Sequence, residues 1–353
     1  MQTRKQFLFT TFSFASGAAV LGRKMFDRLQ SGSTHFHPTF DLHCHPGRLF
    51  AIDQSSPEKF TDAVKTLDEM NKIHLGGAFF SLVADSKIIK AGPTGIQATR
   101  KYEPNEAWEE YKRQLKDMKD FFQSAPVRQA VQANDLKKSG KVAAFLAVEG
   151  GDFLEGQVEK LDEAYTDGIR SIQLVHYAPN ELGDLQTVTP THNGLSSFGK
   201  EVVRKMNKLG MIIDTAHASY QTAKDVADLT DSPIMLSHSI LEMEADRPVA
   251  KRAISKEHAK VIAQTGGLIG AWPSGFNKSF DEFVDNILRL VDVAGIDHVG
   301  IGTDMDGNFK PVLSSYNQYP SLAVALKNKG LSQKEVEKIM GGNASRLLSK
   351  IFK

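Results

Sequence analysis

The triplet His43-Cys44-His45 places two imidazole side chains one residue apart. Side chains at positions i and i+2 of a β-strand point to the same side, so both histidines could bind one metal ion while Cys44 faces away. Imidazole and carboxylate groups are good zinc ligands, and a catalytic zinc keeps one coordination position open for water. The triplet therefore indicates a metal-dependent hydrolase whose metal site begins here.

Cys44 is not expected to take part in catalysis. A nucleophilic cysteine needs an activating base and an exposed, electropositive setting, whereas strand alternation turns this side chain into the core. Cys44 is also the only cysteine of the chain, so it cannot form an intramolecular disulfide, and stability must come from packing.

Further residues able to bind a metal or transfer a proton occur where short apolar runs of the sequence stop. One histidine in such a place is more often a hydrogen-bonded structural residue, so the prediction depends on the joint pattern, in which five of the 11 histidines hold such positions. A glutamate here has two oxygens and could bridge two ions that together polarise a hydroxide. Besides His43 and His45, the candidates are Glu149, His176, His217, His238 and Asp304, while His35, His37, His74, His192, His258 and His298 are expected to be surface or structural residues.

A common scaffold must bring these residues together. Eight short apolar runs alternate with amphipathic stretches such as Ser197–Leu209, a pattern typical of buried parallel strands separated by helices. The longest connection, residues 90 to 141, contains a charged helical stretch that we expect to pack outside the strands. The runs are Phe40–His43, Gly77–Val83, Val142–Val148, Arg170–Val175, Met211–Thr215, Pro233–Ser237, Gly267–Trp272 and Val299–Thr303.

Eight βα units in 353 residues predict an α/β fold, a (β/α)8 TIM barrel of the metal-dependent hydrolase type. Active sites of this fold lie at the C-terminal ends of the strands, and six of the eight runs end at a histidine, glutamate or aspartate. We find no repeat of fixed period, low-complexity tract or Ser/Gly linker. Residues 25–353 are therefore predicted to form a single catalytic domain.

The first 24 residues differ from the rest of the chain. Arg4 and Lys5 precede an uncharged run from Phe7 to Gly22, which is too short and too polar for a comfortable membrane span. This pattern predicts a signal peptide over residues 1–24, of the Sec type or of the twin-arginine type with lysine in place of the second arginine. The alternative is a fraying N-terminus. We expect an exported, extracytoplasmic protein, periplasmic or secreted, with any membrane association limited to this segment.

The composition is ordinary for a soluble globular protein, with 41% hydrophobic and 24% charged residues. The formal net charge is +1, and no basic stripe is interleaved with aromatic residues. These observations exclude a nucleic-acid-binding role and leave a small molecule as the expected partner.

Long segments around the candidate residues resemble the membrane (renal) dipeptidase family of zinc peptidases. The resemblance covers nearly everything from Asp41 onward. It is carried by AVEGG at 147–151, GIRSIQLVHYAPNELGD at 168–184, GLSSFGKEVVRKMNKLGMIIDTAHAS at 194–219, LSHS at 236–239, RAIS at 252–255, HVGIGTDMDG at 298–307 and the closing YPSLAVALKNKGLSQKEVEKIMGGNASRLL.

The resemblance implies two zinc ions in a barrel that hydrolyses dipeptides with a free C-terminal carboxylate. It implies that Glu149 bridges the ions, that His43 and the residue at position 45 hold the first, and that His217 and His238 hold the second. Relatives also suggest a homodimer.

The same resemblance assigns the catalytic and substrate-binding residues. Asp304 would be the general base, and His176 would stabilise the oxyanion of the tetrahedral intermediate. An arginine would bind the substrate carboxylate, a task suited to a bidentate guanidinium. Arg252, before Ala-Ile-Ser, fits the family pattern best, and Arg247, before Pro248, is the second candidate because the segment after His238 is a few residues longer than usual.

His45 departs from the family, which usually has aspartate at this position. Replacing a carboxylate with imidazole removes one negative charge, which predicts a more acidic bridging water and a weaker first metal. The His-x-His form also resembles the wider amidohydrolase superfamily. Another metal-dependent hydrolase, acting on N-acyl amino acids, lactones or cyclic amides, is therefore the alternative. A third hypothesis is a barrel that binds metal or ligand without turnover. Asp304 argues against it, because a protein that only stores metal needs no additional base.

Overall fold

The computed structural model describes residues 38–51, 56, 58–92, 95–138, 140–242 and 251–352. The signal peptide predicted at residues 1–24, the substrate-binding candidate Arg247, and His35 and His37, which were expected to be surface or structural, lie outside these ranges. In the part of the chain that the structure describes, no helix is both long enough and apolar enough to cross a membrane.

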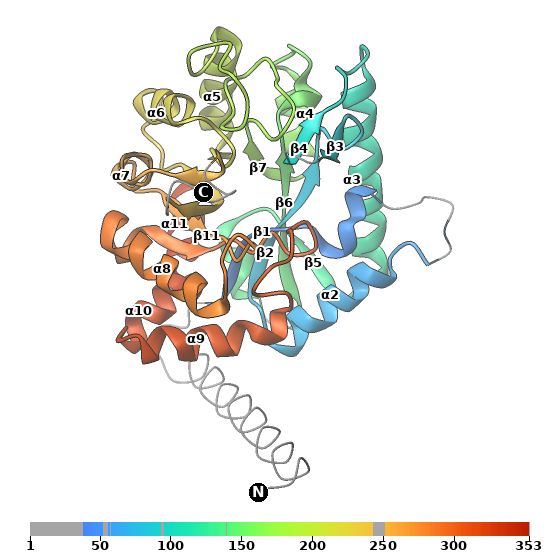
Figure 1. Ribbon diagram of the computed structural model, residues 1–353. Helices are drawn as coiled ribbons and strands as arrows, with labels where there is room; N and C mark the ends of the chain where they lie inside the picture. The colour runs from blue at the N-terminus through green and yellow to red at the C-terminus, as the bar shows by residue number, and fades with distance from the viewer. Residues whose placement is uncertain are drawn as a thin grey trace, which may run out of the picture.

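Eight parallel strands form the wall of an α/β barrel, as predicted (Figure 1). They are hydrogen-bonded in the order β1-β2-β6-β7-β8-β9-β11-β12. The last and first strands meet just beyond their ends, where His45 N donates to Met305 O at 2.9 Å and Asp304 N donates to His43 O at 2.8 Å. Each strand overlaps one predicted run: β1 (Phe40–Cys44), β2 (Gly77–Val83), β6 (Val142–Glu149), β7 (Ile169–Gln173), β8 (Ile212–Asp214), β9 (Met235–Leu241), β11 (Leu268–Ala271) and β12 (Val299–Ile301).

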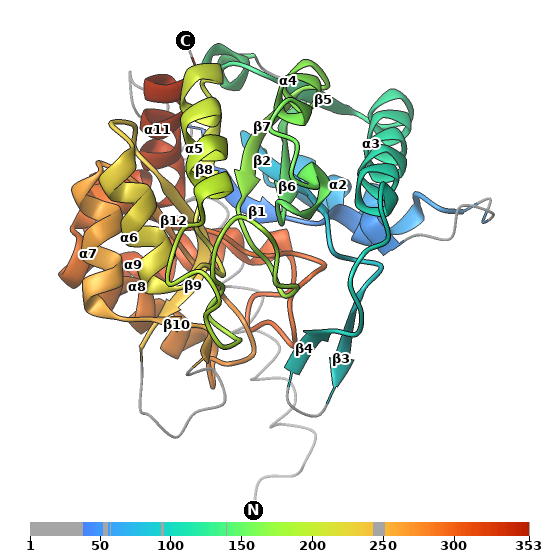
Figure 2. The ribbon, with the colours of Figure 1, turned by 90° about the horizontal axis from the view of Figure 1, so that it is seen from above.

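Helices surround the strands on the outside of the barrel (Figures 1 and 2). The predicted helix Ser197–Leu209 is α5, which begins where Ser196 Oγ accepts from Gly199 N and ends at Gly210 with φ 71°. The other α-helices are α2 (Thr61–Lys72), α3 (Glu106–Ser124), α4 (Lys160–Thr166), α6 (Tyr220–Leu229), α7 (Lys256–Gln264), α8 (Phe280–Ala294), α9 (Tyr319–Asn328), α10 (Gln333–Glu337) and α11 (Asn343–Ile351). Shorter helical turns are Pro46–Ala51, Ala133–Lys137, Asp152–Leu154, Ile296–His298, Tyr316–Gln318 and Lys338–Gly342.

The long connection between β2 and β6 carries α3 on the outside, as expected, together with strands that the sequence did not predict. β3 (Ile89–Gly92) and β4 (Gly95–Ala98) form an antiparallel hairpin that projects from the barrel (Figure 2). β5 (Val127–Ala130) adds a parallel strand beside β6, and the short β10 (Ala253–Ile254) pairs with β9. These strands have two to four residues each, and the hairpin strands contain no buried residue, so no apolar run marks them in the sequence.

Aromatic residues fill the interior of the barrel toward the N-terminal ends of its strands. The rings of Phe40, Phe79 and Phe145 lie within 5.5 to 5.9 Å of one another, and Phe352 after α11 stacks on Phe145 at 5.8 Å. This apolar plug closes the N-terminal end, so the polar residues inside the barrel gather at the opposite end of the strands.

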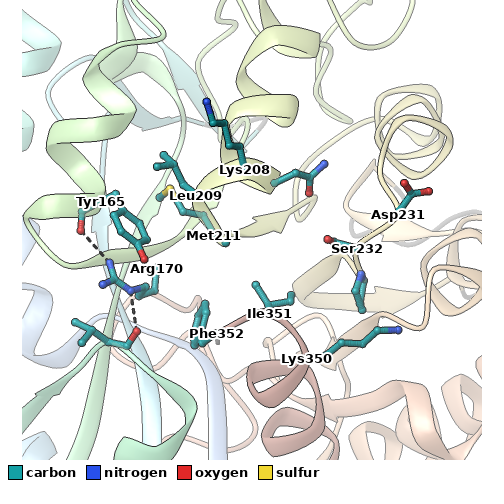
Figure 3. Close-up of a pocket in the computed structure, with 14 residues that line it drawn as sticks. Tyr165, Arg170, Lys208, Leu209, Met211, Asp231, Ser232, Lys350, Ile351 and Phe352 are labelled. Carbon is teal, nitrogen blue, oxygen red and sulfur yellow. Dashed lines mark hydrogen bonds between the residues drawn. The ribbon is translucent and has the colours of Figure 1, made fainter.

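A cavity of about 340 Å³ lies outside this plug, at the N-terminal ends of β7, β8 and β9 (Figure 3). The buried Arg170 lies at its edge, where its guanidinium donates to the carbonyl oxygens of Val131, Tyr165 and Ile169. Because the predicted site residues follow the C-terminal ends of the strands, this cavity is separate from them.

Candidate metal centre and active site

Four histidine rings surround the carboxylate of Glu149, the last residue of β6. Its Oε1 atom lies 3.6 Å from Nε2 of His43, 3.5 Å from Nε2 of His217 and 3.7 Å from Nε2 of His238. Its Oε2 atom lies 3.3 Å from Nε2 of His45. All five side chains are buried. The structure therefore brings the five predicted metal ligands together, with four imidazole rings around the carboxylate of Glu149.

The four histidines form two pairs. The Nε2 atoms of His43 and His45 lie 3.0 Å apart, and those of His217 and His238 lie 3.1 Å apart. Cys44 points the other way, is fully buried and donates to Phe79 O at 3.2 Å, as strand alternation predicts. Each pair thus directs two ring nitrogens toward one point beside Glu149.

The protonation states of these side chains suit metal binding, which needs unprotonated imidazole nitrogens. Burial, followed by the charge of Arg252 on His217 and of His43 on His238, lowers the pKa of both rings well below the usual value. Burial alone would raise the pKa of Glu149, but nearby imidazoles, His176 foremost, lower it well below its usual range. The second histidine pair is therefore neutral beside an ionised carboxylate.

His45 lies between two carboxylates. Its Nδ1 atom lies 3.1 Å from Ser81 O, so the carbonyl fixes the ring and directs Nε2 toward Glu149 and Asp304. Burial lowers the pKa of His45, but hydrogen bonds to Asp304 and Glu149 outweigh it and raise the pKa to about 10. Two carboxylates that favour a proton at this point also favour a metal cation, whose binding would release that proton.

The donor set fits divalent metal ions that prefer nitrogen and oxygen ligands, as zinc does. Within the described chain, three overlapping groups of side chains have ligand atoms that all lie within 4.8 Å of one another. They are His43, His45 and Asp304; His43, Glu149 and His238; and Glu149, His176 and His217.

Asp304, after β12, points toward the first histidine pair. Its Oδ1 atom lies 3.3 Å from Nε2 of His45, and its side chain is 12% exposed. Its φ is 53°, a backbone conformation uncommon outside glycine and often found at functional sites. Gly307 permits this approach, because a Cβ there would lie 2.5 Å from Asp304 Oδ1 and from His45 Cδ2. Gly307 is a site-forming residue for which the only sequence signal was its position in the TDMDG segment.

His176, after β7, lies on the other side of the carboxylate, with Nε2 3.4 Å from Glu149 Oε1. Its Nδ1 atom lies 2.7 Å from Oδ1 of Asp85, a fully buried residue. Burial lowers the pKa of His176, but the charges of Asp85 and Glu149 raise it above its usual value. Sequence reasoning missed Asp85 because it lies two residues beyond the end of β2, a strand end that seemed to carry no candidate.

Arg252, beside β10, is buried next to the second histidine pair. Its guanidinium lies 5.4 Å from the ring of Trp272, which in turn lies 5.7 Å from His238. Its Nη1 atom donates to Oε1 of Gln186. Its Nε and Nη2 atoms are buried and make no hydrogen bond of standard geometry within the described residues, although Tyr177 lies close by. One two-nitrogen edge of the guanidinium thus lacks a hydrogen bond of standard geometry beside the Glu149 centre, with Tyr177 as its neighbour. Arg247 lies outside the described residues.

Four other histidines that the structure describes do not join this centre. His74 follows α2 and is exposed. His192 is exposed and its Nε2 atom contacts Asn180 O, and His298 contacts Gly267 O through Nδ1. His258 is buried in α7, with its ring 5.8 Å from that of Tyr220. Their positions match the structural or surface role expected from the sequence.

The model of the family described as membrane dipeptidase, peptidase family M19, matches residues 30–353. The chain belongs to the membrane dipeptidase family.

Individual relatives agree with this membership. The chain is 30% identical over 261 residues to Dipeptidase tcpJ of Claviceps purpurea, a match that covers 66% of this chain and 60% of that protein. It is 28% identical over 250 residues to Dipeptidase aclJ of Aspergillus oryzae, covering 68% of this chain and 58% of that protein. The matched segment thus spans about three fifths of each curated relative.

The barrel is also similar to that of a solved metallo peptidase. A metallo peptidase from Rhodobacter sphaeroides, liganded with a phosphinate mimic of the dipeptide L-Ala-D-Ala, superposes with a TM-score of 0.77 at 20% identity. The match covers 89% of this chain and 99% of that one. At this identity the likeness shows the shared fold, and the role of each site residue stays a prediction.

Proposed function

We propose that this protein is a zinc-dependent dipeptidase that hydrolyses dipeptides with a free C-terminal carboxylate. The observation that carries the proposal is the Nε–Nη2 edge of Arg252, which is buried beside the Glu149 centre and makes no hydrogen bond of standard geometry within the described residues. A buried cation with two unpaired donors is costly unless a ligand pairs with it, and a carboxylate matches both donors at once. The dipeptidases named among the relatives and the dipeptide mimic bound by the Rhodobacter sphaeroides protein support this substrate class.

Two zinc ions per chain are part of the proposal. His43 and His45 would hold one ion and His217 and His238 the other, with Glu149 shared between them. Bound there, the metal would polarise the scissile carbonyl and lower the pKa of an attacking water.

The remaining steps fall to side chains of this chain. Arg252 binds the substrate carboxylate and so fixes the peptide bond over Glu149. Asp304, with its partly exposed carboxylate beside His45, takes a proton from the attacking water and passes it to the leaving amine. His176 donates from Nε2 to the oxygen that gains negative charge in the transition state.

An exported location and a homodimer complete the proposal. The location rests on the basic and then apolar pattern of residues 1–24. Fractionation of cells that produce the full chain, with N-terminal sequencing of the product, tests export, and sedimentation of the purified protein tests the dimer. A cytoplasmic product with an intact N-terminus would contradict the export proposal.

A matched substrate set tests the activity. We expect rapid hydrolysis of alanyl-alanine and hydrolysis at least about 100-fold slower of alanyl-alanine amide, which lacks the carboxylate that pairs with Arg252. N-acetyl-alanine and a small lactone test the alternative, a different amidohydrolase on the same barrel. Faster turnover of either of these compounds than of the dipeptide would overturn the dipeptidase proposal.

A further inference from the structure

A buried carboxylate from one barrel loop holds the loop that carries His176. Asp85 follows β2, whereas His176 follows β7, and the two residues are 91 positions apart. The Oδ1 atom of Asp85 lies 2.7 Å from His176 Nδ1. Its Oδ2 atom accepts from the backbone N–H groups of Tyr177 at 3.0 Å and Ala178 at 2.9 Å. One side chain therefore fixes three consecutive residues after β7.

The two oxygens of Asp85 have separate tasks. Oδ2 is occupied by backbone donors and anchors the loop, while Oδ1 contacts the imidazole. A carboxylate can only accept, so Nδ1 of His176 must carry a proton. The opposite ring nitrogen, Nε2, is thereby directed at Glu149 Oε1, 3.4 Å away, where the peptide carbonyl is expected.

We propose that Asp85 is a positioning residue for the hydrolytic reaction, which fixes the orientation and the Nδ1 proton of His176 so that Nε2 faces the reacting carbonyl. This inference rests on the proposed function. Asp85 contacts His176 and the loop rather than the Arg252 edge, so it acts on the chemical step through His176 and leaves substrate binding unchanged.

The substitution Asp85→Asn separates the two tasks. An asparagine oxygen at the Oδ2 position keeps both backbone hydrogen bonds, but its NH₂ group then faces Nδ1 as a donor, so Nδ1 gives up its proton. The ring that donated from Nε2 with protons on both nitrogens becomes a neutral and weaker Nε2 donor. We expect kcat for alanyl-alanine to fall about 10- to 100-fold, the usual range for such orienting partners, with KM and metal content unchanged. A change confined to KM would overturn the proposal.

The matched control is Asp184→Asn. Asp184 is also buried and anchors a loop, through the backbone N–H groups of Thr191, His192 and Gly194. Among the described residues it makes no hydrogen bond or ion pair to an imidazole nitrogen. Its substitution should lower stability without changing kcat. If both variants lose kcat equally, Asp85 is a structural anchor and the proposal is wrong.

A double-mutant cycle gives the sharpest kinetic test. If Asp85 acts only through His176, then Asp85→Asn should cost nothing further in a His176→Gln background. The same loss of kcat in both backgrounds would overturn the proposal.

A spectroscopic measurement on the wild-type protein tests the inference without turnover. In protein labelled with ¹⁵N-histidine and loaded with zinc, the Nδ1 resonance of His176 should show a bound proton that is protected from exchange. An unprotonated Nδ1 would overturn the role of Asp85, even if the variants fail to fold. A protonated Nδ1 in a protein that hydrolyses no dipeptide would instead contradict the proposed function and leave the positioning intact.

Discussion

The Nε2 atom of His45 lies 3.3 Å from Oδ1 of Asp304. It lies equally close to Oε2 of Glu149, so a single imidazole separates the predicted base from the predicted bridging ligand. The family resemblance leads one to expect aspartate at this position, which would place three carboxylates side by side. The imidazole therefore lowers the negative charge of the centre while keeping a ligand atom in place.

The first prediction concerns this charge. His45→Asp should strengthen metal binding at the first site by about tenfold, or about 1.4 kcal/mol, because a third carboxylate attracts the cation. It should also move the acidic limb of the pH–rate profile to higher pH, because the added negative charge makes the attacking water less acidic. Competition with a chelator and kcat/KM against pH measure the two effects, with His45→Ala as the variant that loses the ligand. Equal zinc content and equal pH–rate profiles for His45→Asp and wild type would contradict this account.

The second prediction concerns Arg252. Arg252→Met should raise KM for alanyl-alanine about 10- to 100-fold with a small change in kcat, because the Nε–Nη2 edge of the guanidinium binds carboxylate in substrate and transition state alike. Hydrolysis of alanyl-alanine amide should hardly respond, since that substrate has no carboxylate to lose. Arg247→Met distinguishes the second candidate. If Arg247→Met raises KM and Arg252→Met does not, then Arg247, and not Arg252, binds the substrate carboxylate.

The third prediction concerns Asp304 as the proton carrier. Asp304→Asn should lower kcat by about 10²- to 10⁴-fold, the usual contribution of a general acid–base group, while zinc content stays the same. Asp306→Asn is the matched control, because Asp306 lies two residues on but accepts from Gly47 N and Thr66 Oγ1 instead of facing His45. Steady-state kinetics and metal analysis of both variants measure kcat and zinc content. Loss of zinc in Asp304→Asn would show that Asp304 is chiefly a metal ligand.

The fourth prediction concerns stability in acid. Burial lowers the pKa of His258 to about 4 from an ordinary value of 6.5. The unfolded chain therefore binds a proton between these values that the folded protein excludes, so stability is lost as pH falls from 6.5 to 4 and is unaffected above that window. The loss should reach about 3 kcal/mol at the acid end.

His258→Phe tests this prediction by removing the titrating group from the same packed position. The free energy of unfolding of this variant should fall less steeply than that of wild type between pH 6.5 and 4. His192→Gln, at an exposed histidine, should keep the wild-type slope. Parallel slopes for His258→Phe and wild type in urea unfolding would show that His258 contributes nothing.

Much of the barrel could be predicted because its strands are buried on both faces and read as separate apolar runs. These runs also located the site, because the C-terminal ends of the parallel strands lie at one end of the barrel. Six of the predicted strand ends carried a metal-binding or acidic residue. The strands of the β3–β4 hairpin could not be predicted, because they are short and mostly exposed.

The supporting residues of the site were harder to find because their meaning arises from contacts between distant parts of the chain. Asp85 becomes informative only when folding brings it to His176, 91 residues away. Asp41 likewise accepts from His43 N, Thr303 N and Thr303 Oγ1, which ties the first strand to the last across 262 residues. The contacts of the Arg252 guanidinium also exist only in the packed structure, so the sequence could rank the two arginines but not show which donors lack a hydrogen bond.

Reconstitution of the metal-free protein shows whether hydrolysis depends on two zinc ions at the Glu149 centre. The full chain is stripped with a chelator, titrated with zinc, and assayed with alanyl-alanine while bound metal is counted. The account predicts no hydrolysis without metal and full activity at two zinc ions per chain, with Glu149→Gln unable to recover at that stoichiometry. Undiminished dipeptide hydrolysis by the stripped protein, or none after two zinc ions are bound, would contradict it.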